Sequence, residues 1–234
     1  NDGIFALEQA RKLCPKDSTI YYNLGNAYLD VGRADRASEN YKKAYTLDSA
    51  NTDAHINSGL AAVHQGQLKE AAEIYENVLR DSPSNVRVLI ALAQVYRELG
   101  KALEAGVLAR KALEIKDNDA GALYLLSILG HKQELLKIVK PMESVLDMQD
   151  SDPEDKVLAG FGLAHALDKL GLVEEAFYRL EAANEEKKKL VNINLEKFKA
   201  AANLIFTTYS QKTLSLLAGS SLTQAAPIFV FGMP

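Results

Sequence analysis

The chain has 234 residues, of which 47% are hydrophobic and 25% charged, the composition of an ordinary soluble globular protein. Its net charge is −4, so there is no basic excess to hold a nucleic-acid backbone. The single cysteine, Cys14, excludes a disulfide within the chain. No apolar run reaches transmembrane length, and the first residues lack the order of a signal peptide. These features predict a cytoplasmic protein without membrane or nucleic-acid partners.

A single repeat period dominates the first half of the chain. Small residues recur at this constant spacing, namely Gly32, Gly66 and Gly100, Ala37, Ala71 and Ala105, and Gly25, Gly59 and Ala93. Such a period predicts pairs of antiparallel helices, in which small residues let two backbones approach and a left-handed glycine ends each first helix. We therefore predict full repeats at 18–51, 52–85 and 86–119.

The repeat resembles the tetratricopeptide repeat, which has a period of about 34 residues and holds a Leu-Gly pair, a Tyr, an Ala, an aromatic residue and a Pro at fixed places. In the first repeat these places hold Leu24, Gly25, Tyr28, Ala37, Tyr41 and Ser49. Three residues depart from the pattern. Ser49 replaces proline in the first repeat, and in the second repeat His55 replaces the aromatic residue that is Tyr21 in the first, and Ser58 replaces leucine. The resemblance implies an all-α fold, a right-handed superhelical solenoid of antiparallel helix pairs. It also implies that the chain binds a protein or peptide and is not itself an enzyme.

The repeat pattern extends in both directions. Residues 1–17 form the second helix of a half repeat, because three residues fall one period before Tyr41, Ala44 and Ser49, namely Leu7, Ala10 and Pro15. Residues 120–153 form a degenerate repeat, in which Pro141 should kink the second helix or make it start late. The repeats therefore cover residues 1–189.

The last repeat spans 154–189. Asp152 is its expected N-cap, Pro153 takes the first helical position, and Gly171 ends the first helix. After it the period is lost, and we predict connecting helices and a linker over 190–226.

The final segment, PIFVFGMP at 227–234, has the pattern of a short buried strand. It resembles the strand that opens the catalytic domain of sulfotransferases fused to tetratricopeptide repeats, and the resemblance covers 156–234. In that family the strand leads into a loop that holds the phosphosulfate end of 3′-phosphoadenosine 5′-phosphosulfate. The sequence ends before any residue of this loop, so no catalytic or cofactor-binding residue is carried over.

The resemblance to this family implies that the chain is the non-catalytic repeat domain of a sulfotransferase-like protein, which recruits or positions an acceptor or partner for the absent catalytic domain. In the alternative, the apolar tail is a C-terminal strand or extended arm that packs on the last helices. Two surfaces could also pair copies of the chain into a homodimer, the end that lacks a first helix and the C-terminal strand.

The inner face of the solenoid is lined by the first helices, and its polar residues are the candidate peptide groove: Tyr22, Asn23, Asn26, Asn57, Arg87 and Gln94. Asn26, Asn57 and Arg87 reproduce the middle three spacings of the five-residue carboxylate clamp of chaperone-binding members of this repeat family. Tyr22 and Ala91 replace the two outer cations, which weakens the capture of a carboxylate. The second functional hypothesis is therefore a stand-alone, co-chaperone-like adaptor with a general polar peptide groove.

The remaining reactive side chains predict neither catalysis nor a cofactor. None of the four histidines has metal-ligand spacing to another, and no nucleophile motif accompanies them; they are His55, His64, His131 and His165. His55 is expected to be a packed, hydrogen-bonded histidine at an aromatic core position. Cys14, near a helix end, is expected to be an inert thiol that is buried or half-exposed.

Overall fold

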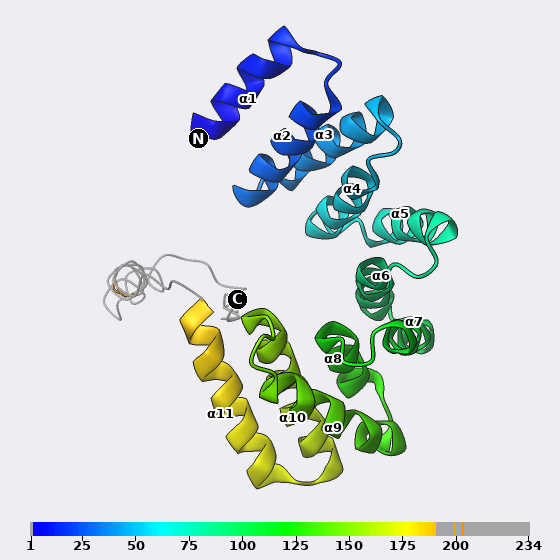
Figure 1. Ribbon diagram of the computed structural model, residues 1–234, viewed down its shortest axis with the longest axis vertical. Coiled ribbons are helices and arrows are strands. Elements are labelled where there is room, and N and C mark those ends of the chain that lie inside the picture. Colours follow the sequence, from blue (N-terminus) through cyan, green and yellow to red (C-terminus); the bar gives the residue numbers. More distant parts are fainter. Residues whose placement is uncertain (1, 191–198, 200–202, 204–234) are drawn as a thin grey trace, which may run out of the picture. The chain divides into compact units, whose positions relative to one another are not determined.

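A computed structural model describes residues 2–190, Lys199 and Asn203, and in this part of the chain it contains eleven α-helices and no strand (Figure 1). The helices are α1 (Asp2–Leu13), α2 (Ser18–Asp30), α3 (Ala34–Leu47), α4 (Thr52–His64), α5 (Leu68–Asp81), α6 (Val86–Glu98), α7 (Ala102–Ile115), α8 (Ala120–Leu129), α9 (Lys132–Asp147), α10 (Pro153–Leu170) and α11 (Val173–Leu190). Apart from Lys199 and Asn203, the predicted connecting helices and C-terminal strand lie outside the described residues.

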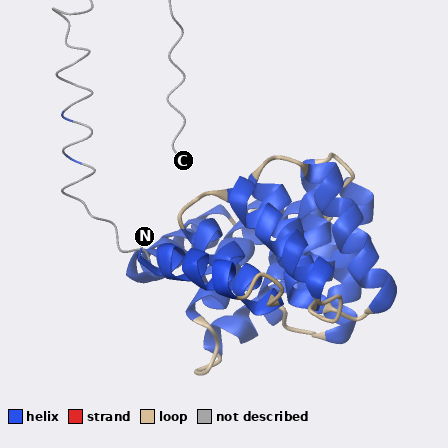
Figure 2. Ribbon diagram, turned by 90° about the horizontal axis from the view of Figure 1, so that it is seen from above, coloured by secondary structure: helices blue, strands red, loops and turns tan. Residues whose placement is uncertain are grey.

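Short loops join consecutive helices (Figure 2). Each helix packs against the next one along the chain. First helices also pack on one another in the later repeats, where α8 contacts both α6 and α10. The result is the solenoid-like, all-helical arrangement that the repeat predicted. None of the described helices combines the length and the apolar character needed to cross a bilayer.

Every first helix from α2 to α10 begins with an Asp or Asn side chain that caps it. The cap oxygen accepts a backbone N–H two or three residues ahead, at 2.8–3.2 Å, and the capping residues are Asp17, Asn51, Asn85, Asp119 and Asp152. An N-cap of this kind is worth about 1 kcal/mol. The predicted cap at Asp152 is confirmed, and the other four follow one another at the period of the repeat.

Four first helices end as the glycine pattern predicted. Gly32, Gly66, Gly100 and Gly171 have φ between +72° and +86°, the left-handed region that favours glycine. The first helix of the degenerate repeat, α8, ends differently. The ammonium group of Lys169, on α10, donates to the carbonyl oxygens of Ser127 and Ile128. A cation from the next repeat thus satisfies the last carbonyls of α8.

Pro141 lies inside α9, and the predicted late start of this helix is wrong, because α9 begins at Lys132. A proline in a helix interior costs about 3 kcal/mol, since it removes one backbone hydrogen bond. Apolar residues before and after Pro141 are buried against the neighbouring helices and hold the helix together through it, namely Leu135, Ile138, Met142 and Val145. Tertiary packing therefore outweighs the local preference.

The small residues of the first helices face aromatic rings of the second helices. A Cβ atom added to Gly25 would lie 2.5 Å from the ring of Tyr41, and one added to Gly59 would lie 2.6 Å from the ring of Tyr75. The space that a side chain would need is thus filled by a buried tyrosine, and not by a closely approaching backbone as the sequence suggested. In the third repeat the equivalent positions hold two alanines, Ala93 and Ala109, which are both fully buried.

Candidate functional site

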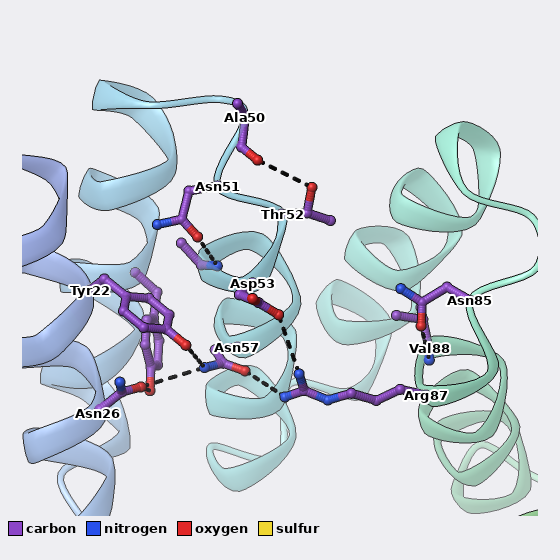
Figure 3. Close-up of polar contacts among 12 residues, drawn as sticks. Tyr22, Asn26, Ala50, Asn51, Thr52, Asp53, Asn57, Asn85, Arg87 and Val88 are labelled. Carbon is purple, nitrogen blue, oxygen red and sulfur yellow. Dashed lines mark hydrogen bonds and ion pairs between the residues drawn. The ribbon is translucent and has the colours of Figure 1, made fainter.

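Polar side chains from three successive first helices meet in one hydrogen-bonded group (Figure 3). The Nδ2 atom of Asn57, on α4, lies 3.5 Å from the Tyr22 hydroxyl and 3.5 Å from Oδ1 of Asn26, both on α2. On the other side, the Arg87 guanidinium of α6 donates to Oδ1 of Asn57 at 2.9 Å. The caps at Asn51 and Asn85 fix where α4 and α6 begin, so residues about one period apart face each other.

A buried tyrosine fixes one end of this group. The Tyr41 hydroxyl, on α3, donates to Oδ1 of Asn26 at 2.7 Å. Burial away from water, and then the nearby Tyr22, raise the pKa of Tyr41 to about 12, so the hydroxyl keeps its proton. Oδ1 of Asn26 therefore accepts from both Tyr41 and Asn57, which orients the amide and leaves its Nδ2 group for another acceptor.

Arg87 forms the other end and is the most accessible member. Its side chain is 59% exposed, and the guanidinium also lies 3.4 Å from the carboxylate of Asp53, on α4. An exposed ion pair of this kind contributes about 0–1 kcal/mol, so it yields easily to a ligand. The group thus presents donors on its open side, the Arg87 guanidinium, the Asn26 amide and the Tyr22 hydroxyl. Such donors suit ligand oxygens, either carboxylates or backbone carbonyls.

Family models agree with the repeat geometry. Two models of the tetratricopeptide repeat match the chain, one over residues 22–85 and one over residues 62–129. This is a tetratricopeptide repeat (TPR) protein. Tyr22, Asn26 and Asn57 of the candidate group lie in the first of these segments, and Arg87 lies in the second.

Known proteins similar to this TPR protein include two curated relatives. Human protein O-mannosyl-transferase TMTC1 is 30% identical over 158 residues, which cover 66% of this chain. The BBSome complex member BBS4 of Bos taurus is 33% identical over 92 residues, which cover 39% of this chain. The chain spans 18% of the length of each relative.

A solved structure shows the same fold. The crystal structure of YrrB, described as a TPR protein with an unusual peptide-binding site, superposes with a TM-score of 0.52 and 23% identity. The superposition covers 78% of this chain and 93% of YrrB.

Four of the six predicted groove residues of the TPR protein come together, and two do not. Tyr22, Asn26, Asn57 and Arg87 share the hydrogen-bonded group. The other two predicted residues, Asn23 and Gln94, are exposed and contribute no hydrogen bond to it. The sequence did not mark Asp53 or Tyr41 as part of the site. Asp53 falls on an inner-face position one full period before Arg87, the one signal that pointed to this pair.

The arrangement differs from a carboxylate clamp at its centre. A clamp asparagine must donate to the ligand, but the Asn57 side chain is buried and its Nδ2 faces Tyr22 and Asn26. Its Oδ1 is occupied by Arg87. Asn57 therefore organises the donors of its neighbours, and the donors that a ligand can reach belong to Arg87, Asn26 and Tyr22.

The other candidate side chains lie apart from this group. The ring of His55 stacks on Tyr45 with centroids 4.2 Å apart, so the predicted packing of this histidine is confirmed, although the residue is half-buried. Cys14 is exposed, which contradicts the prediction of a buried or half-exposed thiol, because it follows the end of α1 in the loop before α2. Within the described residues, no group of three or more His, Cys, Asp or Glu side chains could hold a metal ion.

Two histidines make the stability of the TPR protein depend on pH. Burial lowers the pKa of His55 and that of His165 below the ordinary value of 6.5. The unfolded chain therefore binds protons first as the pH falls, so stability should decrease from pH 7.5 to pH 5.5. Urea unfolding at both pH values should show this decrease. The decrease in the free energy of unfolding should be smaller in the double variant that carries both His55→Gln and His165→Gln. It should be unchanged in the control His64→Gln, because His64 is exposed. An unchanged decrease in the double variant would contradict the assignment.

Proposed function

We propose that this protein is a non-catalytic scaffold that binds an extended peptide of a partner protein across α2, α4 and α6. TPR repeats in general mark protein–protein interaction scaffolds, and the fold is entirely of this kind in the described residues. The observation that carries the proposal is the continuous hydrogen-bonded chain from Tyr41 through Asn26 and Asn57 to Arg87.

The internal hydrogen bonds support peptide binding because they prepare the site in advance. Side chains that are already held in place lose little conformational freedom when a ligand binds. The open donors lie on different helices, on Tyr22 and Asn26 of α2 and on Arg87 of α6, so they can meet successive acceptors of an extended chain. The one cation among them, Arg87, favours a peptide with an acidic side chain or a terminal carboxylate. The peptide-binding site described for YrrB supports the same use of this fold.

Binding measurements on selected peptides test the proposal. Peptides are selected from a random display library on the full chain, and their affinities are measured by fluorescence anisotropy. Arg87→Ala and Asn26→Ala should each weaken binding by about tenfold, the loss of one hydrogen bond to a charged or polar group. Arg33→Ala is the matched control, since Arg33 is an equally exposed arginine in the loop after α2. Equal affinities for the Arg87→Ala, Asn26→Ala and control proteins would overturn the proposal.

A finer proposal places the scaffold beside an enzyme that transfers a group. The sequence resemblance of residues 156–234 to TPR-fused sulfotransferases supports it, and the relative TMTC1, named an O-mannosyl-transferase, is a transferase that contains a segment similar to this chain. The residues encoded after Pro234 in the natural gene test this proposal. An Arg-Ser-Gly-Thr-Thr run would support a sulfotransferase partner domain, and any unrelated sequence would exclude it.

A further inference from the structure

A second surface, made by α8, α10 and α11, is an apolar groove with a volume of about 530 Å³. Its walls are mainly large apolar side chains, Tyr124, Ile128, Phe161, Val173, Phe177 and Leu180. Three of them follow helical spacing along α11 and remain accessible, with Val173 62%, Phe177 61% and Leu180 40% exposed. Exposed apolar side chains that gather in one groove mark an interaction site more often than scattered ones do.

The repeat register shows what shape of ligand the groove fits. Phe177 and Leu180 are the sixth and ninth residues after the left-handed Gly171. In the three regular repeats the equivalent residues are buried, namely Ser38, Ala72 and Gly106 at the sixth position and Tyr41, Tyr75 and Ala109 at the ninth. Both neighbouring first helices cover the ninth position of the first repeat, since the ring of Tyr41 fills the space at Gly25 of α2 and shares a buried cluster with Ala61 of α4. Phe177 and Leu180 of α11 therefore hold positions that are buried among helices in the regular repeats, and a docked helix would bury them in the same way.

Acidic residues at one end of the groove determine which way a docked helix would run and where its basic residues would lie. Asp168 lines the groove near the start of α11, where Glu174 and Glu175 also lie. The cations nearby are engaged, since Lys169 donates to the last carbonyls of α8 and Lys187 lies 5.6 Å from the centre of the Phe161 ring.

A helix packed like the first helices of the array runs antiparallel to α11, so its C-terminal turn lies beside the acidic residues at the start of α11. Basic residues in that turn are favoured both by these carboxylates and by the dipole of the docked helix itself.

We propose that this groove binds an amphipathic α-helix of a partner protein, which lies antiparallel to α11, inserts apolar residues against Phe161, Phe177 and Leu180, and places basic residues beside Asp168 and Glu174. Apolar residues at positions i, i+3 or i+4, and i+7 of the partner helix would form the inserted face. The proposal is independent of the peptide site on α2, α4 and α6, because none of its residues belongs to those helices.

The histidine in the groove fits an apolar ligand. His165 lies among the lining residues, and burial together with the neighbouring Lys169 lowers its pKa. The ring is therefore neutral at physiological pH and leaves Asp168 as the charged group of the lining. A neutral, mostly apolar wall with acidic residues at one end discriminates against an acidic helix and favours a basic one.

A designed helical peptide is the probe that tests the proposal. It has the length of α11, 18 residues, carries leucine at every third or fourth position and lysines in its last turn, and is labelled with fluorescein. Fluorescence anisotropy with the full chain should show saturable binding, about tenfold weaker for Phe177→Glu. Val107→Glu, at a comparably exposed valine of α7, should bind like the unmodified chain. A peptide with glutamate in place of lysine should bind about tenfold more weakly at low salt.

Three results would overturn the proposal. The first is the absence of saturable binding, and the second is equal affinity for Phe177→Glu and Val107→Glu. The third is a groove that is already covered before the peptide is added. To detect this, the environment-sensitive dye acrylodan is attached to Phe177→Cys in a Cys14→Ala background. The dye should report a solvent-exposed site that becomes apolar only when the peptide is added. An apolar signal without peptide would mean that the chain itself or a second copy fills the groove. Arg87→Ala should leave the affinity for this probe unchanged, which separates this site from the peptide site.

Discussion

Replacing Gly59 by alanine should lower the free energy of unfolding by about 1–3 kcal/mol, the usual effect of overpacking a filled core. The new methyl group would lie 2.6 Å from a ring carbon of Tyr75, which is 2% exposed and has little room to move. A glycine-to-alanine change in a helix interior would otherwise stabilise by about 0.5–1 kcal/mol. The sign of the measured change therefore reports the ring contact directly, and urea unfolding of the full chain provides it.

Gly3→Ala is the matched control, because Gly3 also lies in a helix but has no neighbouring atom within 4 Å of an added Cβ. This variant should be as stable as the unmodified chain or slightly more so. A double variant, Gly59→Ala with Tyr75→Ala, reproduces the Ala93–Ala109 pair of the third repeat. Its destabilisation should be smaller than the sum of the two single effects by about 1 kcal/mol. Additive effects would show that the glycine does not accommodate the ring.

Features set by short stretches of backbone could be predicted from the sequence. The left-handed glycines were recognisable because only glycine adopts positive φ at low cost, and they recur with the period of the repeat. The cap at Asp152 was recognisable because an acidic residue precedes a proline at a helix start. Within a regular repeat, each of these features depends on a few consecutive residues, so the rest of the fold does not alter it.

Features that depend on stacking between repeats were predicted only in part. The spacing of Asn26, Asn57 and Arg87 indicated that they lie near one another, but not that Asn57 is buried with its amide already occupied. The cap of α8 by Lys169 joins side chain and backbone across more than one repeat and has no local signal. These contacts depend on how far one helix pair turns against the next, which a single repeat does not determine.

The two proposed sites lie on different repeats and differ in chemistry. The site on α2, α4 and α6 is built from Tyr22, Asn26, Asn57 and Arg87 and presents hydrogen-bond donors. The groove of α8, α10 and α11 is lined mainly by apolar side chains, Tyr124, Ile128 and Phe161 among them. A partner with an acidic or polar extended segment and a separate amphipathic helix would engage both, and the two segments would add to its affinity through their linkage.

The polar group itself should stabilise the solenoid. Asn57→Leu should lower the free energy of unfolding by about 1–3 kcal/mol, because it keeps the side-chain size but removes the partner of Tyr22, Asn26 and Arg87 at once. The leucine is apolar and would gain from burial, so a pure packing effect predicts little change or a small stabilisation. Urea unfolding of the full chain measures the balance between the two.

Asn23→Leu provides the control, since Asn23 holds the same repeat position one period earlier and is exposed. A surface substitution of this kind should change stability by no more than about 0.5 kcal/mol. Arg87→Leu should also have a small effect, about 0–1 kcal/mol, because the guanidinium is largely exposed and water replaces its partners. A large loss at Asn57 with small losses at Asn23 and Arg87 would place the stabilisation at the buried amide, which ties α2 to α4. Equal losses at Asn57 and Asn23 would contradict this, since both would then reflect only the preference of the position for asparagine.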